Sequence, residues 1–273
     1  MAHTLQERYS ELVDAKLRTT LIKKDGVIFN NKYEGDVKAG AVKIPVRDTE
    51  AEAKDYDKAN GVDATEGTTN YVPAIIDQDK AVNEVIDGYD ASSVPDNIVA
   101  DRLDSATYSL GLAIETHATE ILESSATDLG DNSAVTEANA YKLLTKARTK
   151  MSKAKVPNDG RRWVLVSPDF YEAILNHDKF TSASELGDAI KQTGAVGRIA
   201  GFLVFEDITL SETTDFIAGH PDWCCRIKEW QVPVHIQDLS QSGKYIGACA
   251  AQGRKVFTHK VTKPQTLFIK KNG

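Results

Sequence analysis

Residues 93–125, SVPDNIVADRLDSATYSLGLAIETHATEILESS, predict one long α-helix. Their apolar side chains recur every three or four residues and therefore share one stripe of the helix: Val99, Leu103, Ala106, Leu110, Ala113, Ile114, Ile121 and Leu122. Ser93 is a suitable cap, Pro95 suits the first turn, and Asp96 opposes the positive end of the helix dipole. Such a helix would be roughly 45 Å long, longer than a compact domain of this size needs. It predicts a spine between two dissimilar parts of the chain.

The composition is that of a globular protein outside the secretory pathway. Of 273 residues, 41% are hydrophobic and 27% are charged, and no apolar run approaches the ~18 residues that a membrane span needs. The first ten residues, MAHTLQERYS, have neither the apolar core nor the cleavage site of a secretory signal. Cys224, Cys225 and Cys249 do not suggest a disulfide framework. We therefore expect synthesis in a reducing, intracellular compartment and no membrane partner.

Charge is distributed unevenly along the chain, whose formal net charge is −7. Residues 55–130 contain 16 acidic and 3 basic residues, whereas residues 223–273 contain 9 basic and 2 acidic residues. Complementary charge of this kind often acts between molecules. It is equally compatible with two differently solvated surfaces of one molecule, and the sequence alone leaves both interpretations open.

The part before the long helix predicts an arm and a projecting hairpin. Residues 1–40 carry too little apolar surface to fold alone, so we expect an arm that lies on another surface. Residues 41–47 alternate between apolar and polar side chains, which predicts a strand, and their proline confines it to a sheet edge. Residues 71–76 and 81–86 are predicted return strands. The polar segment 48–70 is too long for an ordinary ordered loop, and it predicts a long polar tip.

The part after the helix predicts an α/β module followed by β-structure. Helices are expected at residues 136–153 and directly after Ser167, and a further short helix is expected at residues 184–191. The predicted strands are residues 163–166, 202–205 and 216–218, followed by 232–236, 245–251, 256–261 and 267–269. Alternating helices and strands favour an α/β module, and the basic C-terminal strands are expected to return beside the long helix.

Two segments resemble catalytic motifs without matching them. Ser167 follows a strand and precedes a helix, as a nucleophile does in some hydrolases, but it lacks the flanking glycines of that turn and Pro168 follows it. A helix cap is the favoured interpretation. Residues 194–201, GAVGRIAG, lack the GxGxxG spacing and precede a strand rather than follow one, which predicts a turn. We predict no catalytic and no cofactor-binding residue.

One cluster has the chemistry of metal ligands: His220, Asp222, Cys224 and Cys225. Adjacent cysteines on a strand point to opposite faces, so both rarely reach one metal, and no second pair completes a tetrahedral site. Half-buried thiols are therefore favoured over zinc, and no metal site is predicted. His117 lies near the apolar stripe, where a hydrogen-bonded core histidine is favoured over a catalytic one.

The order of these parts resembles the major capsid proteins of tailed bacteriophages, which share the Hong Kong 97-type fold. The resemblance spans nearly the whole chain, and five local segments carry it: residues 40–46 (GAVKIPV), 163–175 (WVLVSPDFYEAIL), 194–205 (with GRIAGF at 197–202), 216–220 (FIAGH) and 253–257 (GRKVF). Each segment is only loosely characteristic, but their order is fairly specific.

The resemblance implies an α+β fold with five parts. These are an N-terminal arm (residues 1–40), an extended β-hairpin loop (41–90), a long spine helix in the peripheral domain (91–125), an axial α/β domain (126–222) and a β-rich return to the peripheral sheet and axial domain (223–273). The arm and the extended loop would reach across neighbouring subunits. The acidic face of the spine helix, with Asp101, Asp104, Glu115 and Glu123, would look outward from the sheet, and the apolar stripe would pack on it.

The resemblance also implies a structural protein that is not an enzyme. It would assemble with itself into hexamers and pentamers of an icosahedral virion shell around double-stranded DNA, after synthesis in the cytoplasm of the bacterial host. Separate scaffolding and portal proteins are expected partners, and contact with DNA would be non-specific. No lysine–asparagine pair matches the cross-links of some relatives, so none is predicted.

Two other functions remain open from the sequence. An encapsulin-type nanocompartment shell protein has the same fold and would enclose enzymes instead of a genome. A small α/β enzyme would use Ser167 or the region of His220 and Cys224. Particle size distinguishes the enzyme from a shell protein, because an enzyme would form only a small oligomer. Co-purified DNA or a neighbouring portal gene distinguishes the two shell proteins.

Overall fold

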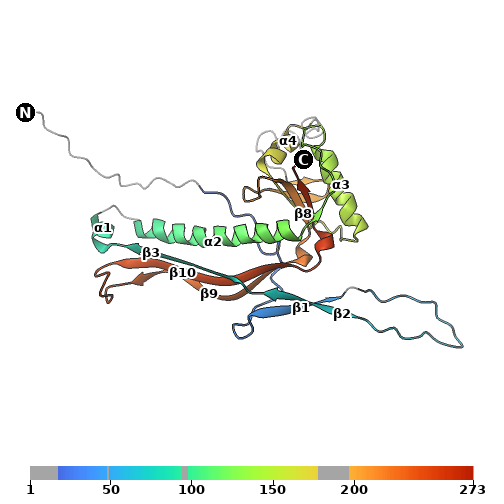
Figure 1. The fold of residues 1–273 in the computed structure, drawn as a ribbon, viewed down its shortest axis with the longest axis horizontal. Helices are drawn as coiled ribbons and strands as arrows, with labels where there is room; N and C mark the ends of the chain where they lie inside the picture. Colours follow the sequence, from blue (N-terminus) through green and yellow to red (C-terminus); the bar gives the residue numbers. More distant parts are fainter. Residues whose placement is uncertain (1–17, 48, 94–97, 178–196, 273) are drawn as a thin grey trace, which may run out of the picture.

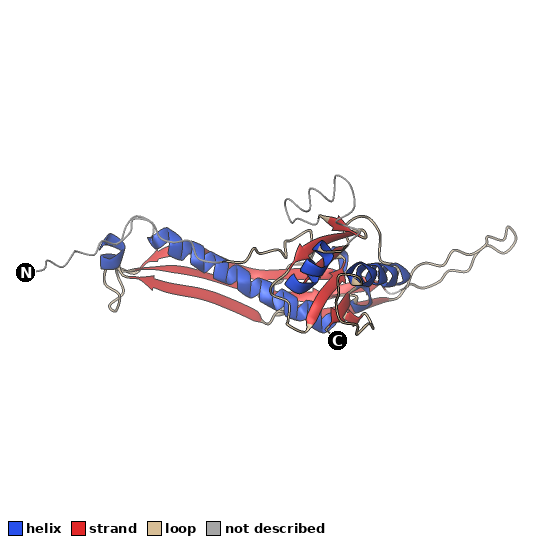
Figure 2. Ribbon diagram, turned by 90° about the horizontal axis from the view of Figure 1, so that it is seen from above, coloured by secondary structure: helices blue, strands red, loops and turns tan. Residues whose placement is uncertain are grey.

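A computed structural model of the chain describes residues 18–47, 49–93, 98–177 and 197–272, so the short helix expected at residues 184–191 lies outside the described residues. A long helix lies over a long sheet at one end of the molecule, a rounded body lies at the other, and a hairpin projects beyond that body (Figures 1 and 2). The helices are α1 (Gly88–Ser93), α2 (Ile98–Ser125), α3 (Ala140–Lys153) and α4 (Pro168–Leu175). The strands are β1 (Ala41–Arg47), β2 (Thr69–Ile75), β3 (Gln78–Ile86), β4 (Thr127–Asp128), β5 (Trp163–Val166), β6 (Arg198–Ile199), β7 (Phe202–Glu206), β8 (Thr214–Gly219), β9 (Cys224–Asp238), β10 (Cys249–Val261) and β11 (Phe268–Lys271), and two 3₁₀ turns lie at Pro221–Trp223 and Pro264–Thr266.

Helix α2 confirms the predicted spine, with a later start. It has 28 residues and is therefore about 42 Å long. Ser93 ends the short helix α1 instead of directly preceding α2, and residues 94–97, which include the expected Pro95 and Asp96, lie outside the described residues.

Helix α2 rests on a three-stranded antiparallel sheet with the order β3-β10-β9. The predicted return of the basic C-terminal strands beside the helix is confirmed (Figure 1). A glycine in β10 allows the close approach, since a Cβ at Gly253 would lie 3.1 Å from Leu110 Cδ1 of the helix. The predicted strand at residues 245–251 starts later, at Cys249, because residues 245–248 form the turn that precedes β10.

The hairpin contains fewer of the predicted strands than expected. Strands β1 and β2 pair antiparallel, from Ala41 opposite Ile75 to Arg47 opposite Thr69. The strand at residues 81–86, predicted to return within this projection, belongs instead to β3 and pairs with β10 in the long sheet. Alternating side chains identify a strand but not its partner. The strand at residues 81–86 was therefore predicted to pair within the hairpin, which is its neighbour in the sequence.

The rounded body contains a six-stranded mixed sheet with the order β4-β11-β8-β5-β7-β6. Helices α3 and α4 cover one face, where Val164, Val166 and Phe216 join the larger hydrophobic core. The other face, with Trp163, Leu165 and Ile217, packs against the arm and the C-terminal end of α2. The sheet is therefore covered on both faces, as its nearly continuous apolar strands require. No helix among the described residues is both long and apolar enough to span a membrane.

Candidate functional site

The first described residues of the arm, 18–23, run parallel to α2. Thr19 N donates to Tyr108 Oη at 3.1 Å, and a Cβ at Gly111 would lie 2.5 Å from Leu21 Cδ1. Arg18 pairs with Asp104, and Lys23 N donates to Glu115 Oε1 at 2.7 Å. Five extended residues advance about 17 Å and eleven helical residues about 16.5 Å, so the two segments stay in register. Gly111 leaves the space that the arm occupies.

Lys23 anchors the arm where the spine meets the rounded body. Its side chain is fully buried, and Nζ lies 2.6 Å from Asp207 Oδ2 and 3.5 Å from Glu115 Oε2. Nζ also donates to Thr209 Oγ1 at 2.7 Å. A buried ammonium needs such partners because its transfer from water is very costly. The lysine therefore ties three segments together: the arm, α2 and the loop after β7.

Glu115 corrects one expectation about the spine helix. It was placed on the outward acidic face with Asp101, Asp104 and Glu123, but it is only 5% exposed and faces the arm. Asp104 is exposed, in agreement with that expectation. The arm, residues 1–40, was expected to reach across neighbouring subunits; of its described part, residues 18–35 pack on their own chain, where Ile28 and Phe29 are completely buried, and residues 1–17 lie outside the described residues.

A chain of buried hydrogen bonds continues from the arm into the long sheet. Arg226 donates from Nη2 to Lys23 O and from Nη1 to Asp25 Oδ1, both at 2.7 Å. Its Nε donates to His259 Nε2 at 3.0 Å, and the Nδ1 atoms of His259 and His117 lie 2.9 Å apart. The expectation that His117 is a hydrogen-bonded core histidine is confirmed.

The arginine fixes where the protons of both histidines lie. Arg226 can only donate, so His259 Nε2 must accept, and in the neutral ring the proton then lies on Nδ1. His117 Nδ1 accepts that proton, which leaves His117 Nε2–H directed toward Asp77 Oδ1, 4.0 Å away. Burial lowers the pKa of His259 to about 2, with Arg226 and His117 adding to the effect. Burial also lowers the pKa of His117, although Asp77 opposes this.

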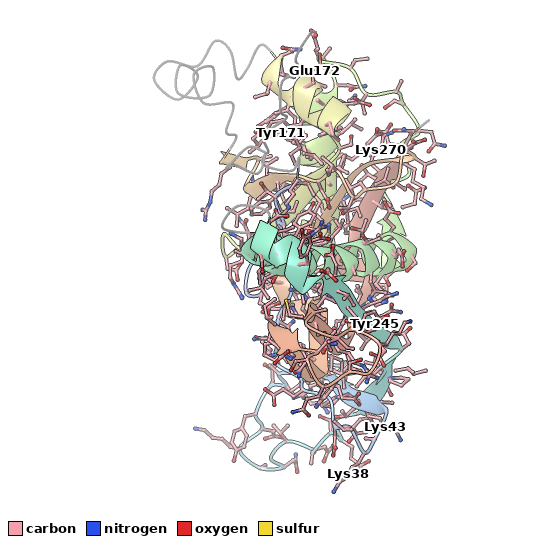
Figure 3. All side chains as sticks on the ribbon, turned by 90° about the vertical axis from the view of Figure 1, so that its left-hand side faces the viewer. Lys38, Lys43, Tyr171, Glu172, Tyr245 and Lys270 are labelled. Carbon is pink, nitrogen blue, oxygen red and sulfur yellow. The ribbon has the colours of Figure 1, made fainter. Side chains whose placement is uncertain are left out.

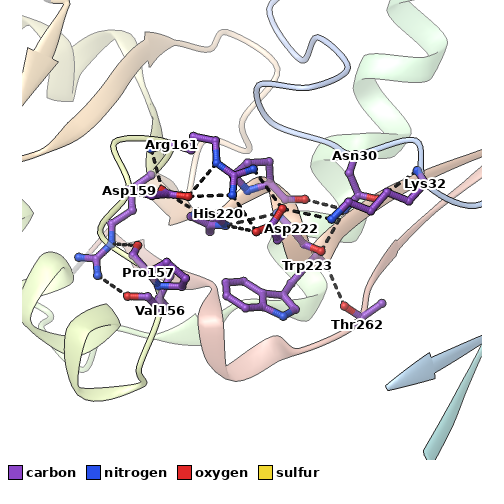
Figure 4. Close-up of polar contacts among 12 residues, drawn as sticks. Asn30, Lys32, Val156, Pro157, Asp159, Arg161, His220, Asp222, Trp223 and Thr262 are labelled. Atoms are coloured by element: carbon purple, nitrogen blue, oxygen red, sulfur yellow. Dashed lines mark hydrogen bonds and ion pairs between the residues drawn. The ribbon is translucent and has the colours of Figure 1, made fainter. Parts of the chain in front are cut away.

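A second polar network holds the next part of the arm (Figure 4). Asn30 Nδ2 donates to the carbonyl oxygens of Pro221 and Asp222, and its backbone pairs with β9. His220 is buried and lies 3.1 Å from Asp159 Oδ1 through Nε2, while its Nδ1 accepts from Asp222 N. Arg161 bridges the carboxylates of Asp159 and Asp222. Every member therefore has a structural partner.

The electrostatics of this network are those of satisfied ion pairs. Burial works to raise the pKa of Asp159, but hydrogen bonds from His220 and Arg161 hold it well below its usual value. The pKa of Asp222 is likewise lowered by Arg161 and Lys32 against the effect of burial. Carboxylates held in this way stay charged at neutral pH and serve as acceptors.

Of the four residues whose chemistry suits metal ligands, His220 and Asp222 are hydrogen-bonded to each other, whereas the two cysteines lie in different cores. Cys224 packs in the core that contains the arm, whereas Cys225 packs under the hairpin with Ile44 and Ile227. The expectation that adjacent cysteines face opposite sides of the strand is confirmed. Burial raises the pKa of both thiols, that of Cys225 to about 11. Among the described residues, no group of three or more His, Cys, Asp or Glu side chains has the arrangement of a metal site.

The two segments that resembled catalytic motifs have structural roles. Ser167 caps α4, because its Oγ accepts from Phe170 N at 3.3 Å, which confirms the predicted cap. Of residues 194–201, the first three lie outside the described residues. Arg198 and Ile199 form the short strand β6, and Ala200 and Gly201, both at positive φ, form the tight turn to β7, so the predicted turn is confirmed at these two residues.

The hairpin presents a face that its own chain leaves uncovered. One face of β1 and β2, including Ile44 and Ala74, packs on Cys225 and Ile227 of β9. On the opposite face, Tyr71 is 65% exposed and Ile75 is 67% exposed. Apart from Ile44, Val46 and Ala74, which are buried on the inner face, and a few residues of intermediate exposure, the described residues of the hairpin and its tip are exposed, and the tip extends away from the body (Figure 2). A two-stranded ribbon of this kind gains little stability by itself.

The charge asymmetry is partly neutralised within one molecule. Arg254 of β10 forms an ion pair with Asp79 of β3. Lys270 is buried, and its Nζ lies 2.8 Å from Asp215 Oδ2. Arg226 and Lys228 share the carboxylate of Asp25. Many C-terminal cations therefore have partners already, whereas the acids of the hairpin tip are exposed to solvent.

Comparisons with known proteins agree on the class of this molecule. A family model described as phage capsid protein matches residues 83–222. No curated relative matches the chain significantly. The model covers half of the chain, from β3 through the turn before β9, and therefore includes the spine and most of the rounded body.

Solved structures extend the similarity of the fold to nearly the whole chain. A chain of Mycobacterium phage Che8 has a TM-score of 0.77 at 22% identity, covering 97% of this chain and 96% of that one. The capsid structure of Cyanophage P-SCSP1u gives a TM-score of 0.79 at 11% identity, over 98% and 93% of the two chains. The capsid of a native GTA particle gives 0.68 at 10% identity, over 98% and 95%. The Hong Kong 97-type α+β fold is thereby confirmed, and the nanocompartment and enzyme alternatives are not favoured.

Proposed function

This chain belongs to the phage capsid protein family and is a structural subunit of a virion shell; from this premise we propose that its copies form hexamers and pentamers that close around double-stranded DNA. Each copy contributes its hairpin β1–β2 to a neighbour in the same ring. The protein has no catalytic role. A separate scaffolding protein and a portal protein are its partners, and assembly takes place in the cytoplasm of the bacterial host.

The observation that carries this proposal is the uncovered face of the hairpin. Tyr71 and Ile75 are large, apolar and about two-thirds exposed, and monomeric proteins rarely leave such side chains together on a projecting ribbon. Burial against a second copy would stabilise them by about 25 cal/mol per Å² of apolar surface. The acids of the tip, which include Asp55, Asp57 and Asp63, add charge that a neighbour can complement.

Assembly of the intact protein tests the proposal most directly. The gene is expressed together with the genes that flank it in its genome, and the product is examined by sedimentation and negative-stain electron microscopy. We expect rings and megadalton closed particles. A chain that remains monomeric at every concentration, although folded by circular dichroism, would contradict the proposal.

Charge reversal in the tip tests the role of the hairpin. Replacing Asp55, Asp57, Asp63 and Glu66 with lysine is expected to reduce particle yield at least tenfold and to leave the subunit soluble, because these side chains are exposed in the single chain. The matched control reverses four exposed acids of the rounded body: Glu137, Glu172, Glu206 and Glu212. Unchanged assembly of the tip variant would contradict a role of the hairpin tip in contacts between subunits.

A further inference from the structure

Basic residues are concentrated in helix α3 and in the loop that follows it. Residues 138–168 contain 8 basic residues and only 1 acidic residue, Asp159. Four of these cations already have partners in their own chain, either carboxylates or carbonyl oxygens: Lys146, Lys150, Arg161 and Arg162. Asp159 is itself occupied by Arg161 and His220. No carboxylate of this segment therefore remains for the other cations.

Four further cations form a surface that is here called the α3 patch: Arg148, Lys153, Lys155 and Arg198. Among the described residues, the side chains of the first three have no hydrogen bond or ion pair, and Arg198 Nη2 donates only to Gly160 O, at 3.3 Å. A Cβ at Gly160 would lie 3.4 Å from Arg198 Nη1, and a Cβ at Gly201 would lie 3.4 Å from Arg148 Cζ. The loop after α3 therefore meets the turn between β6 and β7, and the cations of both segments border this junction.

Lys155 occupies a position at which helices usually have glycine. Lys155 N donates to Ser152 O at 3.1 Å and Val156 N donates to Met151 O at 3.0 Å, which is the Schellman arrangement at the end of α3. The φ of Lys155 is 58°, a left-handed conformation that strains any residue with a bulky side chain. Glycine would be more stable here. The chain carries a cation at the expense of stability, which indicates a role outside the folding of the subunit.

The surroundings of the patch favour duplex nucleic acid over other partners. None of the large apolar side chains that are exposed lies in the described residues from 138 to 206, whereas a protein interface needs an apolar core and single-stranded nucleic acid is bound on exposed aromatic rings. The phosphate backbone of a duplex needs only cations that reach its oxygens. The dipole of α3 stabilises lysines in its last turn, but it does not account for Arg198, which lies on β6.

We propose that the α3 patch binds the phosphate backbone of double-stranded DNA, so that this surface of the rounded body faces the interior of the shell. The inference rests on the proposed function and deepens it, because it assigns the contact with DNA to four residues. Contact through phosphates is independent of base sequence. The chain as a whole carries a net charge of −7 and repels DNA, so a surface of unpaired cations determines the side from which the duplex approaches.

Binding of the unassembled subunit to DNA tests the patch. The probe is a fluorescein-labelled 24-base-pair duplex, and fluorescence anisotropy gives the affinity between 50 and 300 mM NaCl. In the variant with Arg148, Lys153, Lys155 and Arg198 replaced by glutamine, we expect at least tenfold weaker binding at 50 mM NaCl. The slope of log affinity against log salt should be shallower by about 3, since each phosphate contact contributes about 0.9. Absence of binding by the wild-type subunit would overturn the proposal.

The matched control removes the same charge from exposed lysines elsewhere: Lys38, Lys43, Lys54 and Lys58, each replaced by glutamine. Lys38 and Lys43 lie at the opposite side of the molecule from Tyr171 and Glu172 of the rounded body (Figure 3). This variant should bind the duplex with the wild-type slope. Equal weakening by both variants would overturn the proposal, because binding would then follow net charge alone. A patch that binds a labelled peptide of residues 49–66 but not the duplex would also overturn it, and would assign the patch to an acidic protein segment.

The substitution Lys155→Gly separates the role of this residue from folding. It should raise the melting temperature, because glycine suits the left-handed conformation, and should make the salt slope shallower by about 1. A raised melting temperature with an unchanged slope would remove Lys155 from the proposed contact.

Assembled particles give a test that needs no variant. Filled and empty particles of the wild-type chain are treated briefly with an acetylating reagent, and the modified lysines are mapped by mass spectrometry. We expect Lys153 and Lys155 to be acetylated at least fivefold less in filled particles, and Lys38 to be acetylated equally in both. Equal acetylation of Lys153 and Lys155 would reject the contact with DNA while the shell function stands. Absence of any particle would instead reject the shell function itself.

Discussion

The arm, residues 18–35, and the hairpin β1–β2 are neighbours in the chain, and both are extended. The arm completes its contacts within one subunit, where Phe29 and Lys23 are fully buried and Asn30 is hydrogen-bonded to the turn before β9. The described part of the hairpin is anchored at its inner face, where Ile44 packs on Ile227, and by Lys263 Nζ, which donates to Arg47 O at 3.0 Å. Its other face and its tip are exposed. Two extended segments of one chain thus differ in whether their own subunit buries them.

This difference indicates that the arm stabilises the single subunit, whereas the outer face of the hairpin acts in the association of subunits. Removing contacts from the arm should lower the stability of the isolated subunit, because its apolar and charged groups are already desolvated. Removing contacts from the outer face of the hairpin should leave that stability unchanged and alter only the association of copies. The following predictions test this division, in order of decreasing effect on the subunit.

The largest effect is expected from Lys23→Met. The substitution removes the ammonium between Asp207 and Glu115 and leaves two buried carboxylates without their cation. Breaking a buried ion pair from one side typically costs about 3–5 kcal/mol. Urea denaturation of the unassembled subunit measures the free energy of unfolding. The control is Lys24→Met, an exposed neighbour, which should change that energy by less than about 0.5 kcal/mol. Equal effects at the two positions would contradict the view that the arm is part of the core.

The next effect is a dependence of stability on pH that originates beside the arm. The pKa of His259 is lowered to about 2, against about 6.5 in an unfolded chain, so protons bind preferentially to the unfolded state. The stabilisation is complete above pH 6.5 and decreases as the pH falls toward 2. Between pH 7 and pH 5 we expect a loss of about 2 kcal/mol from this residue, and His117, whose pKa is also lowered, adds to it.

Urea denaturation at pH 7 and at pH 5 measures this loss. The depressed carboxyl groups, such as Asp159, titrate in the unfolded state near pH 4, so this range reports mainly on histidine. His259→Gln should remove most of the slope, whereas His235→Gln, at an exposed position, should not. A slope that persists in the His259 variant would assign it to other groups.

The sequence predicted the elements whose side-chain pattern is independent of their neighbours. Strand β1 and strand β5 were predicted with their observed bounds, because alternation in one and a short apolar run in the other are strong local signals. Ser167 was predicted as a cap because its chemistry acts on the next turn of the same helix.

The remaining features depend on contacts between distant segments. Lys23 and Lys24 are indistinguishable by sequence, yet one is buried and the other exposed. Glu115 lies on the polar side of the helix pattern, and only the arm, 92 positions away, makes it a buried acceptor. For the same reason the sequence does not predict that Tyr89 and Ile246 are each 81% exposed, since their exposure depends on how α1 meets the turn near residue 247.

A smaller effect, on thiol reactivity, should separate the two regions at adjacent positions. Cys224 lies in the core with the arm, and Cys225 lies beneath the hairpin. In a Cys249→Ser background and subdenaturing urea, we expect a thiol reagent to label Cys225 first, because undocking of the hairpin base exposes less surface than global unfolding. Ile44→Ala should accelerate labelling of Cys225 about tenfold and leave Cys224 unchanged, as peptide mass mapping would detect. Labelling of Cys224 before Cys225 would show that the core around the arm opens more easily than the base of the hairpin, which would contradict the prediction.

The smallest effect on the subunit, and the most informative one, is expected from Tyr71→Ser. Tyr71 is paired with Pro45 across the hairpin, and its side chain is 65% exposed on the outer face, so little packing is lost in the isolated chain. The free energy of unfolding should change by less than about 0.5 kcal/mol, while the yield of rings falls because the copy that would bury this side chain loses an apolar contact. Ala74→Ser, on the buried inner face, is the matched variant and should show the opposite pattern: a less stable subunit, with assembly affected only in proportion. If both substitutions lower stability equally, the hairpin is held by its own subunit in the way that the arm is, and the division between fold and assembly lies elsewhere in the chain.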